Sequence, residues 1–119
     1  MLLKVNGKMI ARDVDMADTL LKRTMGLMFR MNIPQDYAMF FSINKPCKFS
    51  IHMLFVPFSL DVFFLDSNYR ITQIESLRPW LGFARAKNAT RYMVEMAAGS
   101  VEKHGLEVGQ QMSLENTHT

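Results

Sequence analysis

The amino-acid sequence predicts a mainly β fold, a compact β-sandwich or barrel of about seven short strands with one α-helix, at about residues 18–29, packed against it. Three observations support this prediction. Short apolar runs recur along the chain and are separated by turn-forming residues. Only one segment has the apolar spacing of a full helix. The connections after residue 38 are too short to contain the crossover helices of a parallel α/β sheet.

Length and composition predict a single globular domain over residues 1–119. Hydrophobic residues make up 49% of the chain and charged residues 21%, which is too hydrophobic for a disordered protein. The first residues, MLLKVNGKM, lack the apolar core of a secretory signal, and Cys47 is the single cysteine. We therefore expect a cytoplasmic protein without a membrane span.

The first predicted elements are a hairpin and the helix. Asn6-Gly7 lies between two apolar runs and suits the positive φ angles of a tight hairpin turn. Asp18 or Thr19 then provides a helix cap, and the apolar residues that follow share one broad face as far as about Phe29.

The run from Phe49 to Leu65 is the most hydrophobic part of the chain. Of its seventeen residues, thirteen are apolar and only His52 and Asp61 are ionisable. Pro57 interrupts the run, and a carboxylate is costly inside a bilayer, so the run predicts two buried strands rather than a membrane helix. Asp61 therefore needs a partner in the interior.

Turn residues separate the other elements. Residues 45–46, Lys-Pro, predict a turn before the hydrophobic run, and residues 66–68 predict a turn that pairs residues 69–77 with 60–65 as a hairpin. Gly105 ends a short helical turn that follows Gly99-Ser100. The remaining predicted strands cover residues 38–43, 92–97 and 111–115.

Positive charge is concentrated in residues 76–94, SLRPWLGFARAKNATRYMV, which contain no acid. The cations there are Arg78, Arg85, Lys87 and Arg91, whereas the rest of the chain has ten cations and eleven acids, a net charge of 10 − 11 = −1. Trp80 and Phe83 lie among them, beside residues that favour irregular backbone. This basic, aromatic loop at residues 78–91 is a candidate for polyanion binding, with the rings stacked on bases or sugars. The alternative is a solvated loop whose tryptophan covers one end of the barrel.

Asp61 has a structural and a functional interpretation. In the first, it accepts hydrogen bonds from a neighbouring loop or pairs with Arg23, which holds the helix against the sheet. In the second, it is the general base of a hydrolase-like enzyme, and His52 or Glu95 supplies the second titrating group. The spacing of these residues does not choose between the two interpretations.

The sequence predicts no metal site and no cofactor. His52, His104 and His118 lack the spacing of metal ligands, and a single cysteine excludes a multi-cysteine zinc site. Methionines recur at positions 25, 28 and 31, a spacing that would offer thioether sulfurs to monovalent copper. The other interpretation of this spacing is core packing, which is the commoner use of methionine.

Four segments together resemble a known family. They are RTMGLMFR at 23–30, AMFF at 38–41, HMLFVPFSLDVFFLD at 52–66 and YMVEMAAGSVEKHGLEVGQ at 92–110. In this order they are similar to the motifs of the family called domain of unknown function 192 (DUF192), a widespread uncharacterised group. The resemblance covers nearly the whole chain and implies a small, mainly β fold with one helix and no established activity.

Polar and special positions of that family pattern are matched here by Arg23, Gly26, Asp61 and Glu95. The chain departs from the pattern at three positions. His52 stands where the family usually has tryptophan, Ser59 where it has proline, and Gln110 where it has the aspartate of a final Gly-Asp turn.

Three functions therefore remain open. The favoured one is a small ligand-binding or interaction module whose partner is an unidentified small molecule or protein. The others are a polyanion or single-stranded nucleic-acid binder that uses residues 78–91, and a hydrolase-like enzyme that uses Asp61. The candidate ligand-binding residues are Arg23, Asp61, Trp80, Arg85, Lys87 and Arg91.

Overall fold

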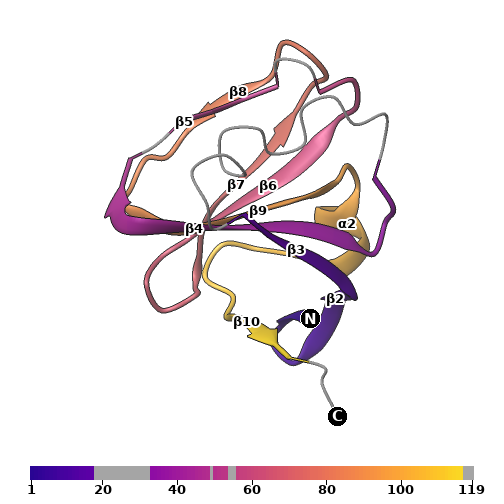
Figure 1. Ribbon diagram of the computed structural model, residues 1–119, viewed down its shortest axis with the longest axis vertical. Helices are drawn as coiled ribbons and strands as arrows, with labels where there is room; N and C mark the ends of the chain where they lie inside the picture. Colours follow the sequence, from indigo (N-terminus) through magenta and orange to yellow (C-terminus); the bar gives the residue numbers. More distant parts are fainter. Residues whose placement is uncertain (18–32, 49, 54–55, 117–119) are drawn as a thin grey trace.

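The computed structural model describes residues 1–17, 33–48, 50–53 and 56–116, with side chains except at 44–47 and 51–52. These residues form ten strands and one short helix (Figure 1). The mainly β fold class is therefore confirmed. The helix predicted at about residues 18–29, which contains Arg23 and Gly26, lies outside the described residues, as do the three regularly spaced methionines.

A five-stranded sheet forms the centre of the fold. Its order is β3 (Asp13–Ala17), β4 (Tyr37–Cys47), β9 (Thr90–Ala97), β6 (Leu60–Leu65) and β7 (Ile71–Leu77). Neighbouring strands are antiparallel except for the parallel pair β3–β4. Every residue of β6 is buried, because β6 has a strand on each side and both faces of the sheet are covered. The predicted hairpin of residues 60–65 with 69–77 is confirmed.

One face of this sheet packs against a second sheet and a helix. The second sheet consists of β10 (Met112–Glu115), β1 (Leu2–Val5) and β2 (Lys8–Ala11), and the helix is α2 (Ser100–His104). The predicted hairpin turn is confirmed, since Asn6 and Gly7 have φ angles of 50° and 82°. The apolar side chains of this layer include Leu3, Ile10, Phe40, Phe63, Leu65, Val94, Met96, Leu106 and Met112.

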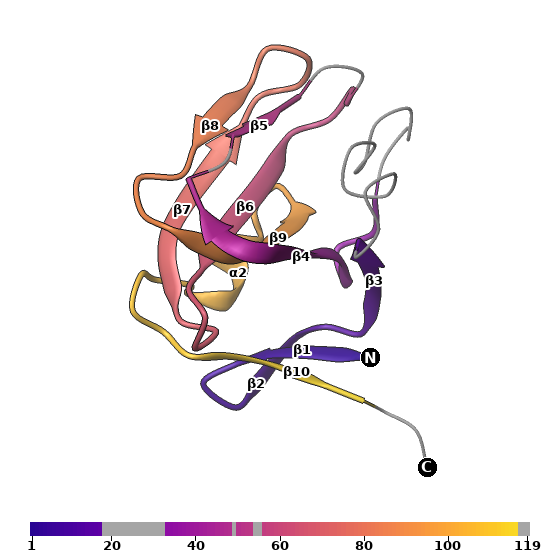
Figure 2. The ribbon, with the colours of Figure 1, turned by 60° about the vertical axis from the view of Figure 1, so that its left-hand side comes forward.

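The other face packs against a two-stranded ribbon of β5 (Ser50–His52) and β8 (Phe83–Arg85). Figures 1 and 2 show this ribbon at the end of the molecule opposite the β1–β2–β10 sheet. The apolar side chains of this layer include Met39, Phe41, Met53, Val56, Val62, Phe64, Ala84, Ala86 and Met93. The described strands thus form a sandwich of layers, and no closed barrel is present among them.

Two local predictions are wrong. Residues 45–46 do not form a turn, because β4 continues through them with a register irregularity between Ser42 and Cys47. Pro46 has no N–H to donate to a ladder, so an irregular stretch of strand accommodates it. Residues 83–85, predicted as part of a loop, form β8, whose exposed, buried, exposed alternation gives the ribbon one inner and one outer face.

No helix in the described part of the chain is long and apolar enough to cross a membrane.

Candidate functional site

The Asp61 side chain is buried and fully engaged in hydrogen bonds. Its Oδ1 accepts a hydrogen bond from the Ser76 hydroxyl at 2.9 Å. Its Oδ2 accepts two backbone hydrogen bonds, from the N–H groups of Gly99 at 3.1 Å and Val101 at 3.0 Å. The predicted hydrogen bonding of Asp61 to a neighbouring loop is confirmed, because both backbone donors lie where β9 leads into α2.

Asp61 provides the cap that α2 lacks in its own sequence. The N-cap residue is Gly99, at φ 94°, and it has no side chain to satisfy the first N–H groups of the helix. The Asp61 carboxylate, on β6, accepts hydrogen bonds from these N–H groups instead. The helix has only five residues and would be unstable alone, so its position depends on this carboxylate and on the packing of Leu106.

Glu95, on β9, is buried, and one of its carboxyl oxygens has no hydrogen-bond partner among the described residues. Only 4% of the residue is exposed, and no described atom forms a hydrogen bond with its Oε1. Burial raises the pKa of Glu95 to about 8, because it removes the water that would stabilise the charged form. The side chain is therefore mostly protonated at neutral pH.

The two acids lie on opposite faces of the central sheet. Directly paired residues share a face, and Asp61 pairs with Met96 whereas Glu95 pairs with Val62. Met96 belongs to the layer of α2, and Val62 belongs to the layer of the ribbon. The sheet therefore separates Asp61 from Glu95, and the two do not form the acid–base pair that a hydrolase-like site requires.

The structure gives less information on two other candidate residues, His52 and Arg23. His52 ends β5 and pairs with Phe83 of β8, so its backbone lies in the ribbon and not beside the strand of Asp61. Its side chain and all of Arg23 lie outside the described part of the structure.

The loop that enters β8 has a fixed backbone. Trp80 donates its N–H to the carbonyl of Val56, and Met53 donates its N–H to the carbonyl of Gly82. Trp80 has a φ of 62°, an angle that a bulky residue adopts only when its surroundings hold it there. A Cβ at Gly82 would lie 2.7 Å from the Arg78 carbonyl oxygen, so only glycine fits this turn.

This fixed loop exposes apolar side chains to solvent. Trp80 is 50% exposed, Leu81 76% and Phe83 64%, whereas most other large apolar side chains of the described residues are buried. Exposed cations flank them at positions 78, 85 and 87, and the described residues provide no ion pair for any of the three. We call Arg78, Trp80, Leu81, Phe83, Arg85 and Lys87 the ribbon surface.

Gln73 of β7, which sequence reasoning did not single out, fastens the ribbon to the central sheet. Its Oε1 accepts the Lys87 N–H at 2.9 Å, and its Nε2 donates to the Arg85 carbonyl at 3.0 Å and to Glu75 Oε2 at 2.7 Å. The side chain is buried. The sequence shows only that Gln73 lies within a predicted strand of alternating pattern. It does not show that the side chain is buried or which groups it bonds.

Arg91 is engaged elsewhere. Its guanidinium donates to the Ser42 hydroxyl at 3.0 Å and lies 4.8 Å from the centroid of the Tyr92 ring. Of the four cations in the predicted basic loop, Arg91 thus contacts β4 and β9, whereas Arg78, Arg85 and Lys87 flank the exposed apolar side chains.

Within the residues that the structure describes, no group of three or more histidine, cysteine, aspartate or glutamate side chains is placed to hold a metal ion.

Comparison with known proteins gives a consistent result. The family model DUF192, described as an uncharacterized ACR, matches residues 1–114. A UPF0127 protein of Thermococcus sibiricus is 34% identical over 114 residues, which cover 94% of this chain and 72% of that protein. A UPF0127 protein of Pyrococcus furiosus is 36% identical over 114 residues, which cover 94% and 95%.

Among solved structures, a protein of unknown function from Novosphingobium aromaticivorans has the same fold. The TM-score is 0.86 at 22% identity, over 96% of this chain and 84% of that chain. The resemblance seen in the sequence is therefore confirmed, and the chain belongs to the DUF192 family.

Proposed function

We propose that this protein is a binding module whose ribbon surface binds a single-stranded nucleic acid. The observation that carries the proposal is the juxtaposition of three exposed apolar side chains at positions 80, 81 and 83 with three exposed cations. Single-strand binders combine these two features, because bases stack on aromatic rings while cations follow the phosphates.

The charge pattern supports a polyanionic partner. Residues 76–94 contain no acid. The carboxylate of Glu75, which precedes this segment in the sequence, accepts a hydrogen bond from Gln73. Clustered cations without partners repel each other, and phosphates relieve this repulsion when they replace the condensed counterions.

The fixed backbone supports binding by a preformed surface. The loop is held by the segment around Met53 and Val56, and β8 is held by Gln73. Side chains on a fixed backbone lose less conformational entropy on binding than those on a mobile loop. The cytoplasm is the compartment we propose for this function, and the single cysteine is consistent with it.

The test is fluorescence anisotropy of a labelled oligothymidylate, titrated with protein at several salt concentrations. The wild type is expected to bind with an affinity that falls steeply with salt. The pair Arg85→Ala/Lys87→Ala should reduce the salt slope by about 2, roughly one per lost phosphate contact.

The matched control is Lys4→Ala/Lys8→Ala on β1 and β2, which removes the same charge outside the ribbon surface and should bind as the wild type does. Absence of binding, or equal losses in the two pairs, would refute the proposal. Binding of an acidic peptide in place of the oligonucleotide would show instead that the ribbon surface recognises a protein.

A further inference from the structure

A second candidate site lies on the other side of the molecule, between α2 and the corner that follows β2. It is a cavity of about 150 Å³ that is partly open to solvent. The residues that line it are Met9, Ile10, Ala11, Arg12, Gln35, Asp36, Lys103 and His104. A volume of this size accommodates a ligand of a few heavy atoms, comparable to benzene.

The walls of the cavity are fixed by backbone contacts. The N–H groups of Arg12 and Asp13 both donate to the Asp36 carbonyl, at 2.9 and 3.1 Å, which joins the β2–β3 corner to the turn before β4. The end of α2 is held by the Leu106 N–H, which donates to the Val101 carbonyl at 2.9 Å. The backbone around the pocket is therefore fixed, as it commonly is at small-ligand sites.

The pocket has one buried polar atom without a described hydrogen-bond partner and two cations without a described ion pair. The Nε2 atom of His104 is buried, and no described group forms a hydrogen bond with it. Neither Lys103 nor Arg12 forms an ion pair with another described residue. A buried polar nitrogen without a partner costs free energy, which a ligand that accepts its hydrogen bond would recover.

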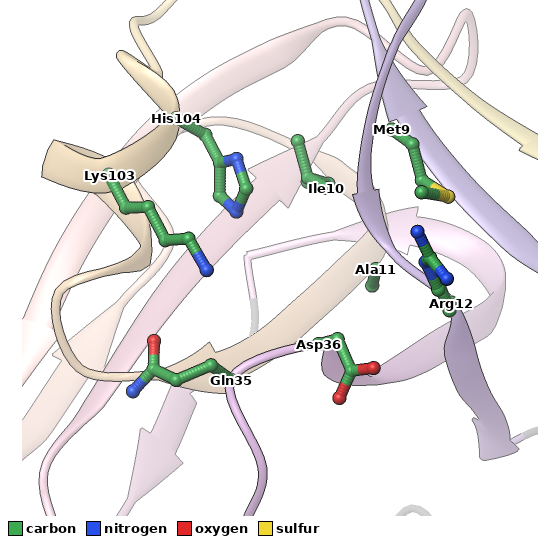
Figure 3. A pocket seen from close by; sticks show the side chains of 8 residues that line it. All are labelled: Met9, Ile10, Ala11, Arg12, Gln35, Asp36, Lys103 and His104. Carbon is green, nitrogen blue, oxygen red and sulfur yellow. The ribbon is translucent and has the colours of Figure 1, made fainter.

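The directions of the side chains favour an anion. Figure 3 shows the His104 ring pointing from α2 into the cavity and the Lys103 side chain extending beside it. In Figure 3 the Asp36 carboxylate points away from Lys103, and no ion pair joins these two described residues. Arg12 lies across the cavity, on the corner after β2 (Figure 3).

From this arrangement we propose that the cavity binds a small phosphate-type oxyanion, which accepts hydrogen bonds from His104 and Lys103 and is balanced by Arg12. The anion is free phosphate or the phosphoryl group of a small metabolite, which have the same recognition chemistry. The site is separate from the ribbon surface and does not depend on the nucleic-acid proposal.

His104 itself provides the readout. Desolvation, and secondly the charge of Lys103, lower the pKa of His104, and the other charged groups at the cavity are Arg12 and Asp36. A bound oxyanion favours the protonated imidazole, so phosphate should raise the pKa of His104.

The experiment is an NMR titration of the full chain with inorganic phosphate, in which the imidazole signals of the three histidines are followed and His104→Gln assigns the His104 signal. Saturable shifts at His104 are expected, together with a rise in its pKa. The exposed substitutions Lys103→Ala and Arg12→Ala should each weaken phosphate binding about tenfold.

Lys8→Ala removes a cation from β2 that does not line the cavity, and it should leave phosphate binding unchanged. Chloride at equal ionic strength should leave His104 unshifted, and a short-chain sugar phosphate should compete with phosphate if the natural ligand is a metabolite. The absence of a saturable shift at His104, or equal effects of Lys8→Ala and Lys103→Ala, would overturn the proposal.

Discussion

The two faces of the central sheet each have one buried carboxyl group among the described residues, and the two groups differ in their hydrogen bonds. On the α2 face, Asp61 accepts three hydrogen bonds, two of them from backbone N–H groups. On the ribbon face, Glu95 is equally buried, but its Oε1 has no partner among the described groups. Two equally buried carboxyl groups thus differ in the hydrogen-bond donors that are directed at them.

The two faces also differ in what lies over their apolar layers. The α2 face uses its acid to hold a helix in place. On the ribbon face, an apolar layer lies beneath the aromatic and basic ribbon surface. Hydrogen bonds with Gln73 and with the Val56 carbonyl hold the backbone of this surface in place. We therefore expect substitutions of the buried acids to change stability, and substitutions of the ribbon surface to change binding.

The largest expected effect is the pH dependence of stability due to Glu95. Its pKa is 4.5 when exposed and about 8 when folded, so the folded state binds the proton more tightly. The resulting stability is fully present below pH 4.5 and is lost as the pH rises through about 8. At roughly 1.4 kcal/mol per pKa unit, the total loss is on the order of 5 kcal/mol.

Urea unfolding of the wild type and of Glu95→Gln between pH 4.5 and 9 measures this effect. The variant should lack the decline, since its amide does not ionise. Glu102→Gln, at an exposed position of α2, serves as the control and should retain the wild-type pH profile. Identical profiles for the wild type and Glu95→Gln would mean that Glu95 is not buried as described.

The next largest effect concerns Asp61. Asp61→Ala removes three hydrogen bonds to a carboxylate and leaves the start of α2 uncapped, so it should cost about 3–5 kcal/mol of unfolding free energy. Ser76→Ala removes only one of these bonds and should cost about 1 kcal/mol. Chemical denaturation compares the two variants, and equal costs would contradict the capping role.

Gly82→Ala tests the fixed loop on the ribbon face. The added methyl group would lie 2.7 Å from the Arg78 carbonyl oxygen and 2.8 Å from the Arg78 nitrogen, and a backbone cannot yield as a flexible side chain does. The expected cost is about 1–3 kcal/mol, with weaker oligonucleotide binding. Wild-type stability and binding in Gly82→Ala would show that the loop is not fixed in this conformation.

A smaller effect is expected from Gln73→Leu, which keeps the volume but removes the bonds to Arg85 and Lys87. We expect a loss of about 1–2 kcal/mol. Hydrogen exchange gives the sharper measurement, because the Lys87 amide should lose protection while the Met112 amide, bonded in the other layer, keeps it. Unchanged protection at Lys87 would show that Gln73 does not hold the ribbon.

The sequence predicted local features well. The Asn6-Gly7 hairpin, the β6–β7 hairpin and the need of Asp61 for an interior partner all follow from short patterns, and the structure confirms them. The identity of those partners did not follow, because the two backbone donors are 38 and 40 residues away along the chain. Contacts at such separations depend on sheet order, which hydrophobic patterning leaves open.

The separation of Asp61 from Glu95 shows the same limit. Each acid lies in a hydrophobic strand, and one interpretation of the sequence placed them in the same cleft. The register of β6 with β9 places them on opposite faces, and a shift of one residue would reverse that result. The strand β8 was also missed, because three residues beside proline and glycine carry too short a pattern to be recognised.

The most direct test of the account uses the fluorescence of Trp80, the only tryptophan in the chain. Titration with unlabelled oligothymidylate at low salt should quench this emission as bases stack on the indole ring, and added salt should reverse the quenching. The same titration of Arg85→Ala/Lys87→Ala should show quenching only at higher oligonucleotide concentrations. Emission that stays constant at saturating oligonucleotide would contradict the central proposal that the ribbon surface binds single-stranded nucleic acid.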